Sequence, residues 1–202
     1  MKIGFLASHN GSNMQAIIDA CKSGALQAFP AVVISNNSNS GALARAKREG
    51  IPYYHLSEKN HHDDPKELDQ SILNVMLEHS VDIIVLAGYM KKLGTKTLSH
   101  FSGRILNIHP ALLPNFGGKG MYGIHVHKAV IAAGATESGV SIHVVNEDYD
   151  TGPIIAQDSV PVYPMDTAET LAARVLRREH TFFPETLQKI VTGEIVLPTQ
   201  NK

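Results

Sequence analysis

Short apolar runs alternate with helix-like segments through the first two thirds of the chain, and this alternation restricts the fold more than any other feature. The strongest run covers residues 81–87, where every side chain is apolar except Asp82. A run of this kind is typical of a central parallel strand that is covered on both faces. The clearest intervening segment has apolar side chains three and four positions apart: Met14, Ile17, Ile18 and Cys21. That spacing indicates a helix.

The order of these segments predicts an α/β fold. We expect strands over residues 3–7, 31–35, 52–56, 81–87 and 104–108, with helices over 13–21, 41–49 and 67–79. Strands that alternate with helices form a Rossmann-like, mostly parallel open sheet flanked by helices. Right-handed crossovers place the carboxyl ends of these strands at one edge of the sheet, where ligands bind.

The last third of the chain has a different pattern. Residues 139–145 and 154–162 have the pattern of strands with no helix between them, so we expect an antiparallel pair. A closing helix should begin near residues 166–169, which have the form of a capping box, and should continue past Pro184. A polar tail follows from Thr192. No repeat or linker divides the chain, so we expect a single domain over residues 1–202.

Composition and charge argue against several classes of protein. The formal net charge of -1 is unlike the basic surface that nucleic-acid binding requires. A single cysteine, Cys21, excludes an internal disulfide and fits a reducing compartment. No apolar stretch approaches the ~20 residues that span a membrane, and the N-terminus does not resemble a signal peptide. We therefore expect a cytoplasmic protein.

A loop between the first strand and the first helix, Asn10-Gly11-Ser12-Asn13, suits an anion. The amides of a first helical turn and the positive end of the helix dipole attract negative charge. The loop has neither the Walker lysine nor the glycine pattern of dinucleotide folds, so a terminal phosphate monoester fits best. The alternative is a plain helix cap, because Ser12 and Gln15 have the form of a capping box.

Three polar side chains indicate a catalytic site. Asn107 and His109 lie two positions apart on one strand and so share a face, and Pro110 ends that strand. An amide and an imidazole can bind an oxyanion, and a carboxylate such as Asp150 can hold the imidazole protonated and carry protons. This set suits acyl transfer onto an amine. The alternative is a structural histidine with an Asx-type turn at Asp150.

Other candidate residues are weaker. His125 and His127 form a His-x-His pair, but zinc needs three or four ligands, so we expect no metal. Cys21 lies on the apolar stripe of its helix and reads as a core residue, not as a nucleophile. Residues 115–127 are rich in glycine, which fits either a flexible lid over the site or a loop that needs positive φ angles.

The chain resembles the folate-dependent formyltransferase family, and within it the phosphoribosylglycinamide formyltransferases. The resemblance runs nearly end to end, through residues 11–13, 82–90, 106–114, His143 and residues 150–155. The strings Asn-x-His-Pro-x-Leu-Leu-Pro and Asp-x-Gly-Pro-Ile-Ile are together specific to this family. The resemblance implies that a formyl group passes from 10-formyltetrahydrofolate, the co-substrate, to the amine of 5′-phosphoribosylglycinamide in purine biosynthesis.

The resemblance also implies roles for individual residues. Asn107, His109 and Asp150 would be catalytic, with Asp150 raising the pKa of His109, and Leu113–Pro114 would be cis. Residues 1–100 would be the phosphate- and nucleotide-binding half, and residues 101–202 the catalytic and folate-binding half. The implied contacts are Gly11, Ser12 and Asn13 for the phosphate, Gly88 and Glu179 for the ribose or glycinamide, and Tyr89, Met90, Lys91, Leu93, Asn107, Val145, Asn146, Glu147 and Asp148 for the folate.

Three rival functions fit less well. Methionyl-tRNA formyltransferase looks like a longer protein with a basic RNA-binding domain, and formyltetrahydrofolate deformylase carries an extra N-terminal domain, whereas the first strand here begins at Lys2 or Ile3. A non-catalytic nucleotide-binding module would explain the sheet but not the three polar residues together. We therefore expect small-molecule substrates, no nucleic-acid or membrane partner, and a monomer or homodimer.

Overall fold

A seven-stranded sheet with the strand order β3-β2-β1-β4-β5-β6-β7 forms the centre of the molecule. The computed structural model describes residues 1–198. Neighbouring strands from β3 to β5 are parallel, whereas β6 and β7 are antiparallel, which confirms the mostly parallel sheet with an antiparallel extension. The strands are β1 (Lys2–Leu6), β2 (Phe29–Ser35), β3 (Tyr53–His55), β4 (Ile83–Leu86), β5 (Ile105–His109), β6 (Glu137–Val144) and β7 (Ile154–Pro161).

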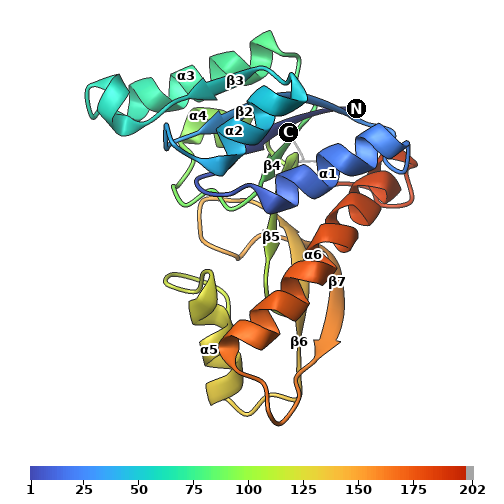
Figure 1. Cartoon of the computed structure of the whole chain (residues 1–202). Coiled ribbons are helices and arrows are strands. Elements are labelled where there is room, and N and C mark those ends of the chain that lie inside the picture. The colour runs from blue at the N-terminus through green and yellow to red at the C-terminus, as the bar shows by residue number, and fades with distance from the viewer. Residues whose placement is uncertain (199–202) are drawn as a thin grey trace.

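Helices cover both faces of the sheet (Figure 1). One face packs against α1, α2, α5 and α6, and the other packs against α3 and α4. The helices are α1 (Ser12–Ser23), α2 (Gly41–Glu49), α3 (Pro65–Glu78), α4 (Thr95–His100), α5 (Ile124–Ala132) and α6 (Ala168–Val191), with a 3-10 turn η1 (Glu58–His61). Figure 1 shows α5 and one end of α6 beside the antiparallel strands, away from α3.

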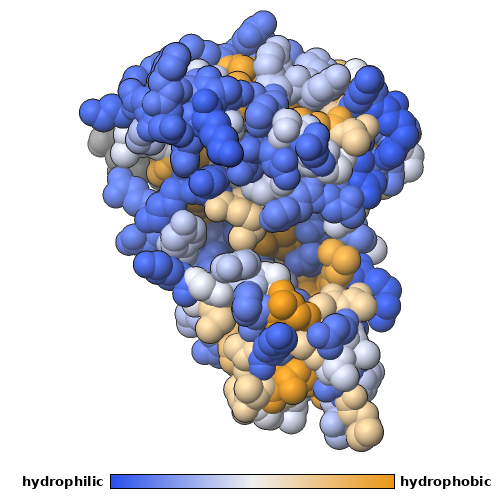
Figure 2. All heavy atoms as spheres, turned by 60° about the vertical axis from the view of Figure 1, so that its left-hand side comes forward, coloured by the Kyte–Doolittle hydropathy of each residue, from blue (hydrophilic) through white to orange (hydrophobic). Residues whose placement is uncertain are grey.

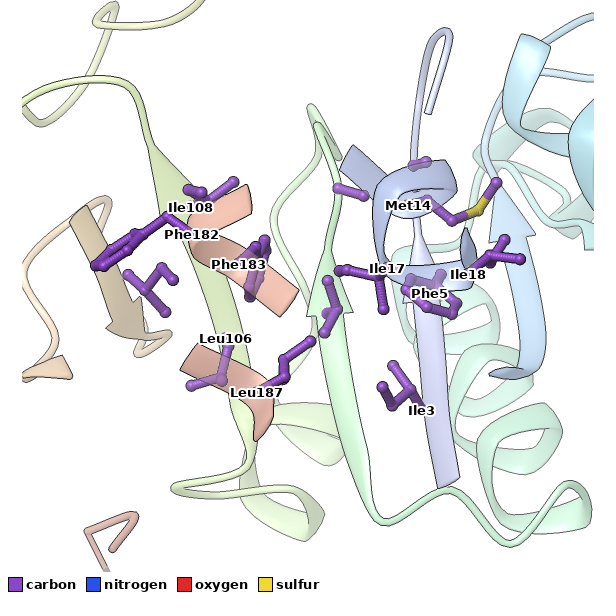
Figure 3. Packing of buried hydrophobic residues seen from close by; sticks show 14 of the residues in the cluster. Ile3, Phe5, Met14, Ile17, Ile18, Leu106, Ile108, Phe182, Phe183 and Leu187 are labelled. Atoms are coloured by element: carbon purple, nitrogen blue, oxygen red, sulfur yellow. The ribbon is translucent and has the colours of Figure 1, made fainter. Parts of the chain in front are cut away.

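The period of two along each strand divides the core between these faces. On β1, Phe5 joins the cluster beneath α1 and α6, whereas its neighbour Leu6 joins the cluster beneath α3. Figure 3 shows the first cluster, in which Ile17 lies near Phe5 and Phe183 of α6 lies near Ile108. Each such side chain contributes about 1.5–3 kcal/mol by leaving water. The core therefore holds α1 and α6 firmly against the same face of the sheet.

The chain reverses its winding direction between β1 and β4, which are neighbours in the sheet. A crevice forms at the carboxyl ends of the strands on either side of such a switch point. Here the two loops are joined, because the Ser8 amide donates to the Gly88 carbonyl at 3.0 Å and the Met90 amide donates to the Ser8 hydroxyl at 2.8 Å. The segments after β1 and β4 therefore meet at one edge, and the end of β5 lines the same cavity as Gly88 and Met90, as we expected.

Two helices were not expected from the sequence. The short α4 begins where the Asp69 carboxylate of α3 accepts from the amides of Lys96 and Thr97, so a distant residue caps it. The predicted loop over residues 115–127 is wrong at its end, because α5 begins at Ile124. This helix has no distinct apolar stripe. It packs against α6, and its Val130 joins the cluster on that face of the sheet.

The last helix agrees with its prediction except at its cap. The capping box lies one residue later than the sequence suggested: Thr167 and Thr170 form it, and Asp166 instead binds Arg174. The helix does continue past Pro184, as expected. The Leu113–Pro114 bond is cis, which was also expected.

The predicted polar tail is described as far as Pro198, and residues 199–202 lie outside the described part. Among helices of residues 1–198, none is long and apolar enough to cross a bilayer.

Candidate active site

The loop after β1 leaves the first amides of α1 without a side-chain cap. Gly11 is the N-cap residue and has a left-handed φ of 68°, and Ser12 is already the first helical residue. The alternative of a Ser12–Gln15 capping box is therefore wrong. The Gln15 side chain instead accepts from Arg45 and Arg48 of α2. With no acidic residue in the first turn either, the start of α1 keeps its positive character.

A buried carboxyl group of α6 lies against this helix start. The Asn13 side-chain amide donates to Glu179 at 2.8 Å, and Glu179 is only 6% exposed. Burial raises the pKa of Glu179 to about 7, although the bond from Asn13 opposes the rise. The carboxyl group is therefore poised between its neutral and charged forms near neutral pH.

The structure brings Asn107, His109 and Asp150 together at the end of β5. Asn107 and His109 share one face of that strand, and each lies opposite a polar residue of β6: His143 faces Asn107 and Ser141 faces His109. The His109 Nδ1 atom is 3.5 Å from Asp150 Oδ2, and the His143 Nε2 atom is 3.4 Å from Asp150 Oδ1. Asp150 thus contacts two imidazole rings.

The His109 ring carries a proton on Nε2. That atom lies 2.7 Å from the Phe116 carbonyl oxygen, which can only accept a hydrogen bond. Burial lowers the pKa of His109, and the nearby Asp150 charge and the Phe116 carbonyl raise it only part of the way back. Asp150 does act to raise the pKa of His109, as expected. The effect of burial is larger, so the ring is neutral at neutral pH and the expected imidazolium is absent from the free protein.

The Asp150 carboxylate stays ionised in spite of its partial burial. Burial acts to raise its pKa, but the nearby His143 ring, the Gly118 amide and the His109 ring together hold the pKa below its usual range. The Gly118 amide donates to Oδ2 at 2.9 Å. An Asx-type turn, the alternative for Asp150, would bind the carboxylate to a backbone amide close by in the sequence. The partners seen here lie in other segments of the chain instead.

His143 is the residue that reasoning from the sequence left without a role. Its Nδ1 donates to the Val144 carbonyl at 3.0 Å, so in the neutral ring Nε2 accepts from the Asn107 side chain at 3.1 Å. The ring is 2% exposed and orients the amide. The signal that would have identified it is the strand register between β5 and β6, which a single sequence does not contain.

A cavity of about 780 Å³ opens beside these side chains. It reaches from Asn13 and Glu179 to His109 and Asp150, and its outer wall is the glycine-rich segment 118–123. A space-filling view shows a hollow between the hydrophilic upper part of the molecule and the more apolar lower part (Figure 2). Of the residues with predicted contacts, it is lined by Asn13, Gly88, Tyr89, Met90, Asn107 and Glu179.

A smaller pocket of about 80 Å³ adjoins the first and shares Tyr89, Asn107 and Asp150 with it. Its walls include Leu86 and Leu98, which the sequence did not indicate. The residues predicted to contact folate that line it are Tyr89, Lys91, Leu93, Asn107, Val145, Asn146, Glu147 and Asp148. Met90 lines only the larger cavity, and Gly11 and Ser12 line neither.

Some side chains at the site were not anticipated. Lys92 donates to the Glu147 carbonyl at 3.0 Å and lies over the Tyr149 ring, so it braces the loop before Asp150. The buried His127 of α5 faces the larger cavity. Within residues 1–198, no group of three or more histidine, cysteine, aspartate or glutamate side chains is placed to hold a metal ion.

A family comparison agrees with this geometry. The model of the formyl transferase family matches residues 1–187. The match covers the loop before α1, the strand that carries Asn107 and His109, and the segment around Asp150. The chain therefore belongs to the formyl transferase family.

Individual relatives narrow the family further. A phosphoribosylglycinamide formyltransferase of Haemophilus influenzae is 40% identical over 196 residues, which are 97% of this chain and 90% of that protein. A chloroplastic phosphoribosylglycinamide formyltransferase of Vigna unguiculata is 43% identical over 96% of this chain, but the chain spans only 62% of that relative. The crystal structure of glycinamide ribonucleotide transformylase 1 from Symbiobacterium toebii matches with a TM-score of 0.90 and 35% identity, covering 98% of this chain and 91% of that one. Within the family, the chain groups with the phosphoribosylglycinamide formyltransferases.

Proposed function

We propose that this protein transfers a formyl group from 10-formyltetrahydrofolate to the amine of 5′-phosphoribosylglycinamide, giving the N-formyl product and tetrahydrofolate in de novo purine biosynthesis. The observation that carries the proposal is the position of Asn107, His109 and Asp150. They lie where a large cavity that reaches the start of α1 adjoins a smaller pocket. The family membership supports the same reaction.

The larger cavity suits the acceptor because its lining runs from the start of α1 to Asp150. Its phosphate would lie at the uncapped amides of Gly11, Ser12 and Asn13, where the helix dipole favours an anion. Glu179 lies next to Asn13 and lines the cavity, so it can exchange hydrogen bonds with ribose hydroxyls. The acceptor amine would then point towards Asp150.

The smaller pocket fits a folate. Its walls are apolar at Leu86, Leu93 and Leu98, which suits a flat ring system, and Lys91 and Lys92 line it with positive charge suited to glutamate carboxylates. When bound, the folate would supply the formyl group.

The residues at the site can stabilise the charge that appears during transfer. The Asn107 amide and the His109 Nε2–H can both donate to the formyl oxygen as the amine attacks its carbon. In the free protein the Asn107 amide donates to His143 and the His109 Nε2–H donates to the Phe116 carbonyl. Because Nε2 carries only one hydrogen, the formyl oxygen must displace the Phe116 carbonyl from it. Asp150 is ionised and can accept a proton from the amine and return it to the leaving nitrogen, directly or through His109.

An absorbance assay tests the proposal. The purified protein is mixed with a 10-formyl dideazafolate, and release of the deformylated product is followed with and without 5′-phosphoribosylglycinamide. Release that depends on the acceptor is expected. Release without acceptor would point to a deformylase, and no release would point to a binding module. The Asp150→Asn variant is the control for non-enzymatic loss of the formyl group.

We also propose that residues 1–202 act as one formyltransferase domain, as a monomer or homodimer, in the cytoplasm and without nucleic-acid or membrane partners. The charge and composition of the chain support this. Sedimentation analysis and cell fractionation are the direct tests.

A further inference from the structure

Residues 110–118, which we name the strap, leave β5 after His109 and return to the same site. Near its end, the Phe116 carbonyl accepts from His109 Nε2 at 2.7 Å, and the Gly118 amide donates to Asp150 Oδ2 at 2.9 Å. The strap therefore contacts the reactive ring and the reactive carboxylate at once. Whatever holds the strap in place also fixes how these two groups are presented.

Two side chains outside the site hold the beginning of the strap. The Ser141 hydroxyl of β6 donates to the Ala111 carbonyl at 2.6 Å and accepts from the Leu113 amide at 3.0 Å. The Gln157 side-chain amide of β7 donates to the Ser141 hydroxyl at 2.8 Å and to the Leu113 carbonyl at 2.9 Å. Ser141 is completely buried, so removing its hydroxyl would take away a partner of both the Ala111 carbonyl and the Leu113 amide.

The strand register explains why these two residues reach the strap. Ser141 is paired with His109 across β5 and β6, and Gln157 is paired with Ser141 across β6 and β7. The three side chains thus form one row across the sheet, and they share a face because paired residues point the same way. The hydroxyl stands in an otherwise apolar stretch, between Val140 and Ile142.

We propose that Ser141 and Gln157 are positioning residues for formyl transfer, an inference that rests on the proposed function. They anchor the strap. In the free protein the Phe116 carbonyl then keeps the His109 proton on Nε2 until the formyl oxygen replaces it, and the Gly118 amide keeps the Asp150 carboxylate in place. The Nε2–H is the donor that the formyl oxygen needs, and Nδ1 is left free to take a proton beside Asp150. When the anchor is lost, the ring can change its tautomer and the carboxylate loses a donor.

Gln157→Met is the main test, because Gln157 is exposed and methionine keeps its length without its donors. We expect kcat to fall at least about tenfold while both KM values stay within about twofold, since misplaced groups affect the transition state more than binding. The acid limb of the kcat profile should move to higher pH, because the Gly118 amide lowers the pKa of Asp150. Ser159→Ala, on the same strand and face, is the control and should match the wild type.

A second pair of variants isolates the buried hydroxyl. Ser141→Thr and Ser141→Val add the same methyl group, but only threonine retains the hydroxyl. Threonine should preserve most of the wild-type kcat, and valine should lose as much as Gln157→Met. Equal activity in the two would overturn the role of the hydroxyl.

A measurement without substrates separates this inference from the proposed function. The ¹⁵N resonances of His109 should report a proton held on Nε2 in the wild type and a mixture of tautomers in Gln157→Met. If the wild-type protein does not transfer a formyl group, the proposed function is wrong, but the His109 resonances still test whether Ser141 and Gln157 fix the tautomer. Unchanged His109 resonances, or a Gln157→Met variant that loses only stability, would overturn the positioning role.

Discussion

Glu179 provides a stability test that depends on a single buried group. The carboxyl group is 6% exposed at the contact between α6 and the start of α1, and one side-chain amide, that of Asn13, binds it. Its pKa is about 7, against an ordinary value of 4.5, because burial disfavours the charged form. The unfolded chain therefore releases this proton at a lower pH than the folded chain does.

The sign of the effect follows from proton linkage. Between the two pKa values the folded state holds more protons than the unfolded state, so stability falls as the pH rises, and the cost becomes constant above the folded pKa. With pKa values of about 7 and 4.5, the loss between about pH 5.5 and about pH 8 is about 2 kcal/mol. Glutamine cannot ionise and still accepts from Asn13, so Glu179→Gln should avoid this loss.

Urea unfolding followed by circular dichroism at about pH 5.5 and about pH 8 measures the difference. The advantage of Glu179→Gln over the wild type should grow by about 2 kcal/mol between the two conditions. Glu169→Gln on the same helix is the control, because the pKa of Glu169 is lowered by bonds at the helix start and the substitution should give no such gain. A constant difference between wild type and Glu179→Gln would refute a carboxyl group that titrates near neutrality.

Three further predictions concern catalysis. His109→Gln and Asp150→Asn should each lower kcat at least ~100-fold in the absorbance assay, with an unchanged circular dichroism spectrum; wild-type turnover in either would reject its role. Ser12→Asp should raise the acceptor KM at least about tenfold and leave the folate KM unchanged, because it places a negative charge at the phosphate site; an unchanged acceptor KM would count against that site. His143→Leu should lower kcat about tenfold or more by releasing the Asn107 side chain, and steady-state kinetics that match the wild type would show that the amide needs no such partner.

The order of strands and helices was readable from the sequence because each element carries its own local signal. The apolar run over residues 81–87 is β4, and Gly50 ends α2 as a left-handed cap. The elements that were missed depend on distant residues instead. Asp69 caps α4 from another helix, and α5 packs against α6 and has no distinct apolar stripe.

The candidate site divides in the same way. Pro110 marks the end of a strand, so His109 could be placed at the edge of the sheet from the sequence. The contact of Asp150 with His143, and the row from His109 to Gln157, require the register of three strands. A shift of one residue would turn these side chains to the other face, and no local pattern defines that choice.

The protonation of His109 shows why residue type alone was insufficient. A histidine beside an aspartate suggests an imidazolium, and the carboxylate does act in that direction. The ring is 3% exposed, however, and the cost of burying a charge is larger. A neutral ring at rest suits the reaction proposed here, because Nδ1 can then accept a proton when negative charge develops on the formyl oxygen. The ionised Asp150 at 3.5 Å stabilises the ring most at that moment, so the same buried pair favours the charged transition state over the resting state.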